Sequence, residues 1–459
     1  APRLGFAYRA APKTVFRGFV GVLYHGMQNA NIDFAERVGF QASGEPLPPA
    51  NRFAQYYSWD RPFPAEALVN TRDASLRNGQ GVQAQDPNGV ARAPKSYMWS
   101  ANIQQELKGN ILVDLSYIAN NMKNGTDRFP LNALPEQYWK LGRLLDLPLN
   151  NPQVVAAGYR APYAGFDVTQ PLFQALRPFP QYLNVIENAT NATSSTYHAF
   201  IVKVQKRYSN GLSFLGNYTV SKFITDSQWA PGAFGAGPSV PNNRKLDKGL
   251  YRFDIPQRLV LSYSYDLPFG RGKKWLSHSR MVDLAVGGWT FTGLHQYQRG
   301  QPAAFGGSFN TLIPTIGGRA DRVANVPTRS SISCGDLVHG DPSRNYVFNA
   351  GNPAQAARTG RPLAFAPAGE YQVGNTPRID PKARQCGRMN EDFALFKSFA
   401  IKGDSIRFRV GAESFNVFNR HTWMSGETGP AVTAADFGEV LPFQPYGPRT
   451  VRLKFRVEW

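Results

Sequence analysis

The sequence predicts an all-β chain that crosses a membrane as part of a transmembrane antiparallel outer-membrane β-barrel. Segments of alternating apolar and polar residues dominate the chain, and most of them run to ten residues or more. Short and long connections alternate strictly between these segments. About ten residues is the length that a tilted strand needs to cross a bilayer. Such strands, joined by short turns at one end and long loops at the other, are typical of outer-membrane barrels.

Eleven segments have the period of two that places successive side chains on opposite faces of a strand. In the fourth segment, for example, Val113 and Leu115 face one way and Asp114 faces the other. In a barrel, the apolar face contacts lipid and the polar face lines the lumen. The eleven segments are 2–9, 14–24, 96–107, 110–121, 196–208, 212–224, 257–268, 287–299, 391–401, 404–418 and 449–459.

The connections are the stronger signal. Gly, Asn and Lys at the short links suit tight hairpins, whereas soluble domains rarely carry loops beyond about fifteen residues. Every long connection follows a strand of the same direction, so all of them emerge at one end of the sheet. The short links are 11–13, 108–109, 209–211, 270–286 and 402–403, and the predicted extracellular loops are about 25–95, 122–195, 225–256, 300–390 and 419–448.

The same alternation predicts the orientation of the chain. Long loops of such barrels are extracellular and short turns periplasmic, which places Trp459 at the periplasmic rim and Ala1 at the extracellular side. A complete barrel with an even number of strands has both termini in the periplasm, and unpaired strand edges are costly in lipid. We therefore expect an odd number of further strands before Ala1.

Composition narrows the class of protein. The formal net charge of +19 favours an anionic partner, such as nucleic acid, lipid headgroups or an acidic ligand. The cations alternate with apolar residues instead of clustering on a helix, which argues against nucleic acid. No stretch approaches eighteen apolar residues, and no signal peptide is visible. The six histidines are scattered, and no GxSxG, HExxH or P-loop motif occurs, so we predict no enzyme, no cofactor and no metal site.

Several smaller features have two interpretations each. Cys334 and Cys386 belong to no CxxC motif and fall in one long connection, so they form a disulfide in an oxidising compartment or remain free thiols. Apolar residues at helical spacing in 134–147 predict a short helix in a loop. The "RPFPQY" run at 177–182 is either an aromatic ligand surface or loop packing. Tyr24, Tyr97, Trp99, Tyr117 and Phe223 suit an aromatic girdle at the outer strand ends, and Trp275 suits one at the periplasmic rim, or all are ordinary strand and turn residues.

Several segments resemble the C-terminal barrel half of Oar-like TonB-dependent transporters, which are abundant in Acidobacteria and related soil bacteria. The resemblance covers nearly the whole chain and is less clear in 27–90 and 305–385. The segments that carry it are "PRLGFAYR" (2–9), "LPEQYWKLGRLLDLPLNNP" (134–152), "LRPFPQYLNV" (176–185), "STYHAFIVKVQKRYSNGLSFLGNYTVSKFITD" (195–226), "RLVLSYSYDLPFGRGKKWLS" (258–277), "GGWTFTG" (287–293) and "RFRVGAESFNVFNRH" (407–421).

The resemblance implies a twenty-two-stranded barrel of which this chain supplies strands twelve to twenty-two. It implies a plug domain, not present here, that couples the barrel to the TonB complex, and TonB-dependent transport of a large solute such as a siderophore, glycan or peptide. Its implied partners are outer-membrane lipid and lipopolysaccharide, the barrel-assembly machinery and, in some relatives, a surface lipoprotein. The alternatives are a passive porin-like channel, a surface adhesin that uses the long loops, and a soluble β-propeller or sandwich.

The last two strands supply the predicted site residues. Five cations are expected on one patch of lumen wall: Arg407, Arg409, Arg452, Lys454 and Arg456. They attract an anionic solute, or they pair with acidic residues of the plug or with Glu413 and Glu458. The terminal alternation of Phe455, Val457 and Trp459 resembles the signal that the barrel-assembly machinery recognises.

Overall fold

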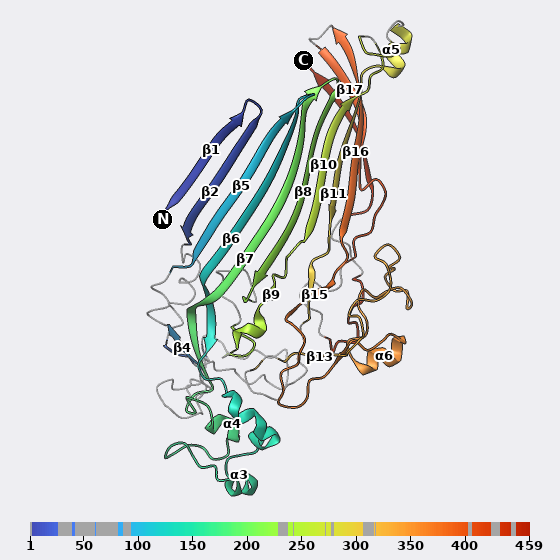
Figure 1. Ribbon diagram of the computed structural model, residues 1–459. Helices are drawn as coiled ribbons and strands as arrows, with labels where there is room; N and C mark the ends of the chain where they lie inside the picture. Colours follow the sequence, from blue (N-terminus) through green and yellow to red (C-terminus); the bar gives the residue numbers. More distant parts are fainter. Residues whose placement is uncertain are drawn as a thin grey trace.

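A single antiparallel path of eleven strands forms the body of the computed structural model, which confirms the predicted fold class (Figure 1). The strands follow one another in chain order. They are β1 (Arg3–Ala11), β2 (Thr14–Tyr24), β5 (Lys95–Leu107), β6 (Ile111–Pro130), β7 (Asn184–Ser209), β8 (Leu212–Thr225), β10 (Gln257–Asp266), β11 (Trp289–Gln298), β16 (Arg388–Lys402), β17 (Ile406–Phe415) and β18 (Thr450–Glu458).

The structure describes residues 2–25, 39–41, 60, 81–85, 93–227, 237–241, 243–270, 272–276, 280–305, 316, 318–402, 406–423, 432–441 and 447–459. Within these ranges, β1 pairs only with β2 and β18 only with β17, so the sheet is open. Most of the predicted loop 25–95 and the predicted turn at Gly403 lie outside the described residues. No helix in the described part is long and apolar enough to span a membrane.

The two faces of the sheet differ in polarity, because residues paired across antiparallel strands share a face. Leu115 pairs with Ile103 on β5 and with Val202 on β7, whereas the next residue, Asp114, pairs with Gln104 and Lys203. One face, the outward face, is therefore apolar, and its side chains include Leu4 at 69% exposure and Leu453 at 73%. The other face, the lumen face, is polar.

Strands β6 and β7 are longer than the sequence predicts. The predicted segments end at residue 121 and begin at residue 196, but β6 continues to Pro130 and β7 begins at Asn184. Their pairing is irregular between Met122 and Gly125, where Asn124 has a φ of 56°. This bulge breaks the period of two, so the extension leaves no alternation to detect. The extension of β7 pairs in parallel with β4 (Gly81–Gln85), which in turn pairs with β3 (Gly39–Gln41).

Short turns lie at one end of the sheet and long connections at the other (Figure 1). At the short-turn end, helix α5 (Arg280–Val286) projects between β10 and β11, and the C-terminus lies nearby. At the other end, the described parts of the connections 131–183, 226–256, 299–387 and 416–449 form one packed body, which we call the cap. Its elements are η3 (Glu136–Asp146), α3 (Pro152–Ala156), α4 (Leu172–Ala175), η4 (Arg244–Asp247), β9 (Gly249–Leu250), β12 (Pro302–Ala304), β13 (Asp321–Arg322), α6 (Pro353–Thr359), β14 (Phe365–Ala366) and β15 (Ile379–Arg384).

Three apolar clusters hold the cap together. The largest joins Phe348 and Phe365 to Phe437 of the last connection, and all three side chains are fully buried. A second cluster joins Leu145 to residues of two other connections, and a third lies within 131–183. The predicted helix at 134–147 is present as η3, which consists of two short 3₁₀ segments separated by a kink at Gly142, with Leu145 buried.

Candidate functional site: the lumen wall and the cap

The five predicted cations lie on the lumen face of the last two strands. Arg409 of β17 is directly opposite Arg456 of β18, and Gly411 is opposite Lys454. Arg407 and Arg452 occupy the same face further along their strands, because residues two apart in a strand share a face. The structure therefore places all five residues on one face of β17 and β18, with Arg407 and Arg452 at opposite ends of the patch.

Local partners neutralise part of this patch. The ammonium of Lys454 lies 2.6 Å from the carboxylate of Glu413, and the Arg456 guanidinium lies 3.2 Å from that of Glu458. Arg409 is stacked at 4.4 Å over the ring of Phe396, and its buried Nε has no hydrogen-bond partner among the described residues. Two carboxylates face five cations, so the patch keeps a net positive charge.

The wall on β5 and β6 is polar, and its charged side chains are the carboxylates of Glu106 and Asp114. The amide of Asn102 donates to Asp114 at 2.5 Å and to the Ser116 hydroxyl at 2.7 Å, and Ser116 in turn donates to Asp114 at 2.6 Å. Hydrogen bonds fix these side chains against the wall. This part of the wall therefore differs from the cationic patch on β17 and β18.

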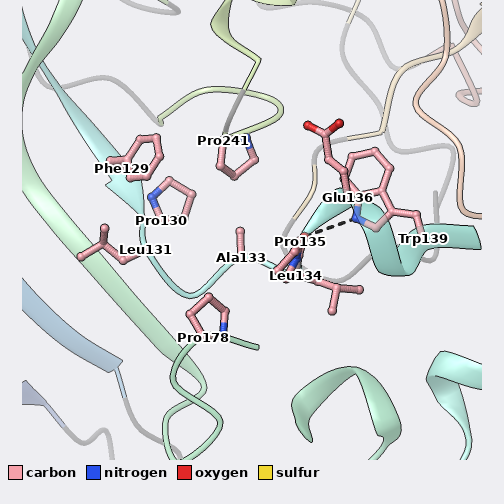
Figure 2. A pocket seen from close by; sticks show the side chains of 10 residues that line it. All are labelled: Phe129, Pro130, Leu131, Ala133, Leu134, Pro135, Glu136, Trp139, Pro178 and Pro241. Carbon is pink, nitrogen blue, oxygen red and sulfur yellow. Dashed lines mark hydrogen bonds between the residues drawn. The ribbon is translucent and has the colours of Figure 1, made fainter. Parts of the chain in front are cut away.

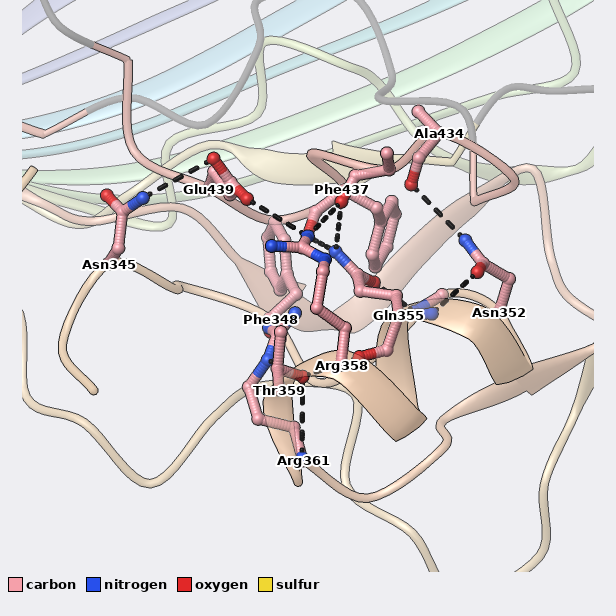
Figure 3. Close-up of polar contacts among 12 residues, drawn as sticks. Asn345, Phe348, Asn352, Gln355, Arg358, Thr359, Arg361, Ala434, Phe437 and Glu439 are labelled. Atoms are coloured by element: carbon pink, nitrogen blue, oxygen red, sulfur yellow. Dashed lines mark hydrogen bonds and ion pairs between the residues drawn. The ribbon is translucent and has the colours of Figure 1, made fainter. Parts of the chain in front are cut away.

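Helix α6 joins the two connections that share the largest apolar cluster (Figure 3). Gln355 is fully buried and donates to the carbonyl oxygens of Phe437 at 2.7 Å and Ala435 at 3.2 Å. The side-chain oxygen of Asn352 accepts a hydrogen bond from the backbone N–H of Gln355 at the N-terminal end of the helix, as a capping residue does. Burial lowers the pKa of Arg361, just beyond the helix, to about 10.

Ion pairs with buried carboxylates connect segments of the cap that are distant in sequence. Arg244 lies 2.9 Å from Asp127 on the β6 extension, and Arg319 lies 2.7 Å from Asp247. Burial raises the pKa of Asp127, although the Arg244 charge opposes this shift. Burial likewise lowers the pKa of Arg319. Two further pairs of this kind are Arg384–Asp254 and Arg322–Asp380.

An apolar pocket of about 190 Å³ opens where the β6 extension meets η3 (Figure 2). Phe129 lines one side and Trp139 the other, and the indole N–H of Trp139 donates to the carbonyl oxygen of Leu134 at 3.3 Å. Glu136 is the one carboxylate among the lining residues. The pocket suits an apolar or ring-shaped group. The remaining lining residues are Pro130, Leu131, Ala133, Pro135, Pro178 and Pro241.

The "RPFPQY" run serves mainly to pack the loop. Arg177 is buried and donates to Gln174 at 2.9 Å and to the Leu183 carbonyl oxygen at 2.5 Å. Of this run, Pro178 alone lines the pocket.

Cys334 and Cys386 form a disulfide with a Cα–Cα distance of 5.7 Å, which ties the cap to the chain two residues before β16.

The terminal residues Phe455 and Val457 lie on the outward face, and Trp459 is 94% exposed beyond the strand. Tyr24, Tyr97, Trp99 and Tyr117 also lie on the outward face. Phe223 does not. It pairs with Tyr197 on the lumen face and packs against Tyr251 at 4.6 Å. Its odd number places it in phase with the polar residues of β8, so its assignment to the girdle is wrong.

Among the polar residues on the outward face that sequence reasoning missed are His295 of β11 and Glu391 and Lys397 of β16. Glu391 is fully buried and accepts from Tyr297 at 2.9 Å and from Arg420 at 2.7 Å. Each of the three occurs in phase with the apolar residues of its strand, and that position was the available signal.

The described residues contain no cluster of His, Cys, Asp or Glu that could hold a metal ion.

Comparisons with known proteins agree with this architecture. The family described as "Outer membrane beta barrel domain" matches residues 1–452, whereas a search of the curated proteins finds no match. Similar solved structures include the ferric citrate transporter FecA in the unliganded form, at 9% identity and a TM-score of 0.39 over 100% of this chain and 37% of that one. The FrpB iron transporter from Neisseria meningitidis has 10% identity and a TM-score of 0.38, with coverages of 100% and 38%.

A third structure, the ferric preacinetobactin receptor BauA from Acinetobacter baumannii, has 9% identity and a TM-score of 0.39 over 99% of this chain and 35% of that one. The chain thus spans little more than a third of the length of these three proteins. The family match covers almost all of the sequence, and the open antiparallel sheet has the two-faced wall and sorted connections that such a barrel requires. The chain belongs to the outer membrane beta barrel domain family.

Proposed function

We propose that the chain is the C-terminal part of the barrel of an Oar-like TonB-dependent transporter, contributing strands twelve to twenty-two. In this proposal the whole protein carries a plug domain before Ala1 and takes up a large solute across the outer membrane of a Gram-negative, Acidobacteria-like cell. The TonB complex acts through the plug, and the barrel-assembly machinery inserts the protein. A surface lipoprotein is a candidate partner at the cap.

One observation supports transport of a recognised solute most directly: a cap built as one folded body stands at the mouth of a net-positive lumen wall. Its four connections share apolar clusters and buried ion pairs. A passive pore needs only an open mouth, whereas selection of a solute needs surfaces held in fixed positions. The apolar pocket beside Trp139 and the cations of β17 and β18 suit a solute with both ring-shaped and anionic groups.

Uptake in cells tests this proposal. Labelled siderophores, anionic glycans and peptides are supplied to cells that express the full-length protein, with and without an active TonB complex. We expect accumulation of one class only when TonB is active. Accumulation that is independent of TonB, together with steady conductance in planar bilayers, would identify a porin, and cell-surface binding without uptake would identify an adhesin.

The lumen patch is tested by charge removal. Arg409→Gln together with Lys454→Gln removes two of its cations, and Lys108→Gln with Lys140→Gln removes two exposed cations elsewhere. We expect the first pair to lower uptake of an anionic solute at low ionic strength more than the second pair does, because electrostatic attraction acts through the local field. Equal uptake by both variants would assign the patch to contacts within the wall or with the plug.

A further inference from the structure

Four aromatic side chains form a continuous surface where the lumen face of the wall meets the cap. Tyr197 of β7 pairs with Phe223 of β8 on the lumen face, and their ring centres lie 5.7 Å apart. The ring of Tyr251, just after β9, lies 4.6 Å from that of Phe223, and the ring of Phe253 lies 5.5 Å from that of Tyr251. We call these four residues the aromatic row. Their presence calls for an explanation, because barrel interiors are lined mainly by polar side chains.

Polar side chains border the aromatic row along the wall. Toward the cap, Ser195 pairs with Thr225, and Ser221 lies on the same face toward the short-turn end. Phe253 is 50% exposed, although the Arg252 guanidinium stacks on its ring at 5.0 Å. The row is therefore an apolar surface with a polar border, and accessible surfaces of this kind mark binding sites.

Backbone and carboxylate contacts hold the aromatic row in place. The backbone N–H of Tyr251 donates to the carbonyl oxygen of Phe223 at 2.8 Å, and the N–H of Phe223 donates to the Asp254 carboxylate at 2.8 Å. Asp254 is buried and also pairs with Arg384 of β15 at 2.7 Å. The backbone that carries the rings is thus fixed before a ligand arrives, and a preorganised surface loses less conformational entropy on binding.

The aromatic row combines apolar ring faces with hydroxyl groups that can bond a ligand. The hydroxyls of Tyr197 and Tyr251 have no hydrogen-bond partner in the described part of the chain. A pyranose ring has the complementary pattern, with C–H groups on its faces and hydroxyl groups around its rim. Tyrosine suits such a ligand, because its ring is apolar and its hydroxyl is polar. Ligand sites commonly combine aromatic walls with a few fixed polar groups in this way.

We propose that the aromatic row binds a glycan chain, with pyranose rings of the chain against its aromatic side chains. This inference rests on the proposed function and names the class of solute that the proposed function leaves open. Successive rings in one surface suit a chain of linked sugars, which presents one ring after another. The row lies below the cap at the mouth of the lumen, so a glycan bound there is already on the path of entry.

Binding of neutral oligosaccharides to the purified full-length protein in detergent tests the inference, with isothermal titration calorimetry as the readout. The probes are maltohexaose, cellohexaose and xylohexaose, which carry no charge, so the cations of β17 and β18 do not attract them. We expect at least one probe to bind. Tyr197→Leu with Tyr251→Leu removes two rings and should weaken its binding at least about tenfold, because aromatic anchors dominate binding surfaces.

Two further double variants separate the rings from their hydroxyls and from aromatic content in general. Tyr8→Leu with Tyr218→Leu, the matched control, removes two rings of the outward face and should bind as the unmodified protein does. Tyr197→Phe with Tyr251→Phe keeps both rings and should bind more tightly than the double leucine variant. Heat-modifiable migration on gels verifies that each variant is folded.

Three outcomes would overturn the inference. These are failure of all three probes to bind, equal affinity of the double leucine variant and the unmodified protein, and a double phenylalanine variant as weak as the double leucine variant. The dependence of uptake on TonB tests the proposed function separately. TonB-dependent uptake of a siderophore or a peptide, without binding of any oligosaccharide, would contradict only this inference. Oligosaccharide binding without TonB-dependent uptake would contradict only the proposed function.

Discussion

The ammonium of Lys397 lies 2.6 Å from the carbonyl oxygen of Gly287 and 3.1 Å from that of Ala285. A cation on the outward face of β16 therefore satisfies carbonyl groups at the C-terminal end of helix α5, where helices leave such groups unpaired. The same ammonium lies 5.2 Å from the Trp289 ring. Lys397 is nearly fully buried by these contacts, and they hold α5 against the outward face at the short-turn end.

Removal of this cation should release the helix. In Lys397→Met the side chain keeps its apolar stem but cannot bond the two carbonyl oxygens, so we expect faster cleavage within 270–288 by a protease added to the periplasmic side. Lys206→Met is the control, because Lys206 also lies on the outward face but bonds Gly109 and Ser209. An unchanged cleavage rate in Lys397→Met would show that the helix is held by other contacts.

Arg420 should stabilise the protein by pairing with the buried Glu391. Arg420→Ala leaves that carboxylate without its charged partner, and an unsatisfied buried group costs about 1–3 kcal/mol. We expect a loss of this size in the free energy of unfolding, measured by urea titration in lipid vesicles. Adding Glu391→Gln should restore part of the loss, and a double variant as unstable as the single one would contradict this account.

Asp127 should make the stability of the cap depend on pH. Burial raises its pKa above the ordinary value of 3.8. A carboxyl group whose pKa is higher in the folded state contributes stability that is complete below the unfolded pKa and is lost as the pH rises through the folded pKa. Asp127→Asn should therefore flatten the loss of protease resistance of the cap as the pH rises above the ordinary pKa of 3.8. An unaltered profile would assign the pH dependence to another group.

The disulfide should hold the cap to the barrel. It closes a segment of 52 residues, and the chain-entropy relation gives about 4 kcal/mol for a loop of that length. Cys334→Ser with Cys386→Ser should increase proteolysis within 327–387 while the barrel stays resistant. Reduction of the unmodified protein should have the same effect, and reduction should leave the double serine variant unchanged.

Trp459 should act in membrane insertion. It is exposed at the short-turn end beyond the outward-facing Phe455 and Val457, where an assembly factor could reach it. Deletion of Trp459 should lower the amount of folded protein in the outer membrane, measured by heat-modifiable migration, and Trp459→Phe should restore it. Normal insertion of the deletion variant would rule out this role.

The strands could be predicted because their hydrogen-bonding geometry imposes a period of two on the sequence. The lumen patch followed from the same rule, since β17 and β18 are consecutive and Arg409 has to share a face with a residue such as Arg456. A bulge limits this reasoning. The period of two is lost after Asn124, so the extension of β6 could not be predicted from the sequence. The role of Lys397 could not be predicted from the sequence of β16, because the carbonyl groups that it contacts belong to the connection between β10 and β11.

Most of the cap could not be predicted from the sequence, although the spacing of the apolar residues in 134–147 predicted η3. Arg319 and Asp247 are 72 residues apart and meet only because two connections pack together. The sequence around each of these two residues does not identify the other as its partner. The pocket beside Trp139 has the same origin, since residues of three separate connections or strand ends line it.

The shared aromatic cluster of the last two connections has a consequence for recognition by antibodies. Phe348 and Phe437 are fully buried together although they come from opposite sides of the β16–β17 hairpin. Much of the surface above them is therefore a discontinuous epitope, composed of two stretches that meet only in the folded protein. If the cap faces the outside of the cell, as the proposed function requires, we expect linear peptides copied from either connection to raise antibodies that bind the folded protein less well than antibodies raised against the intact barrel.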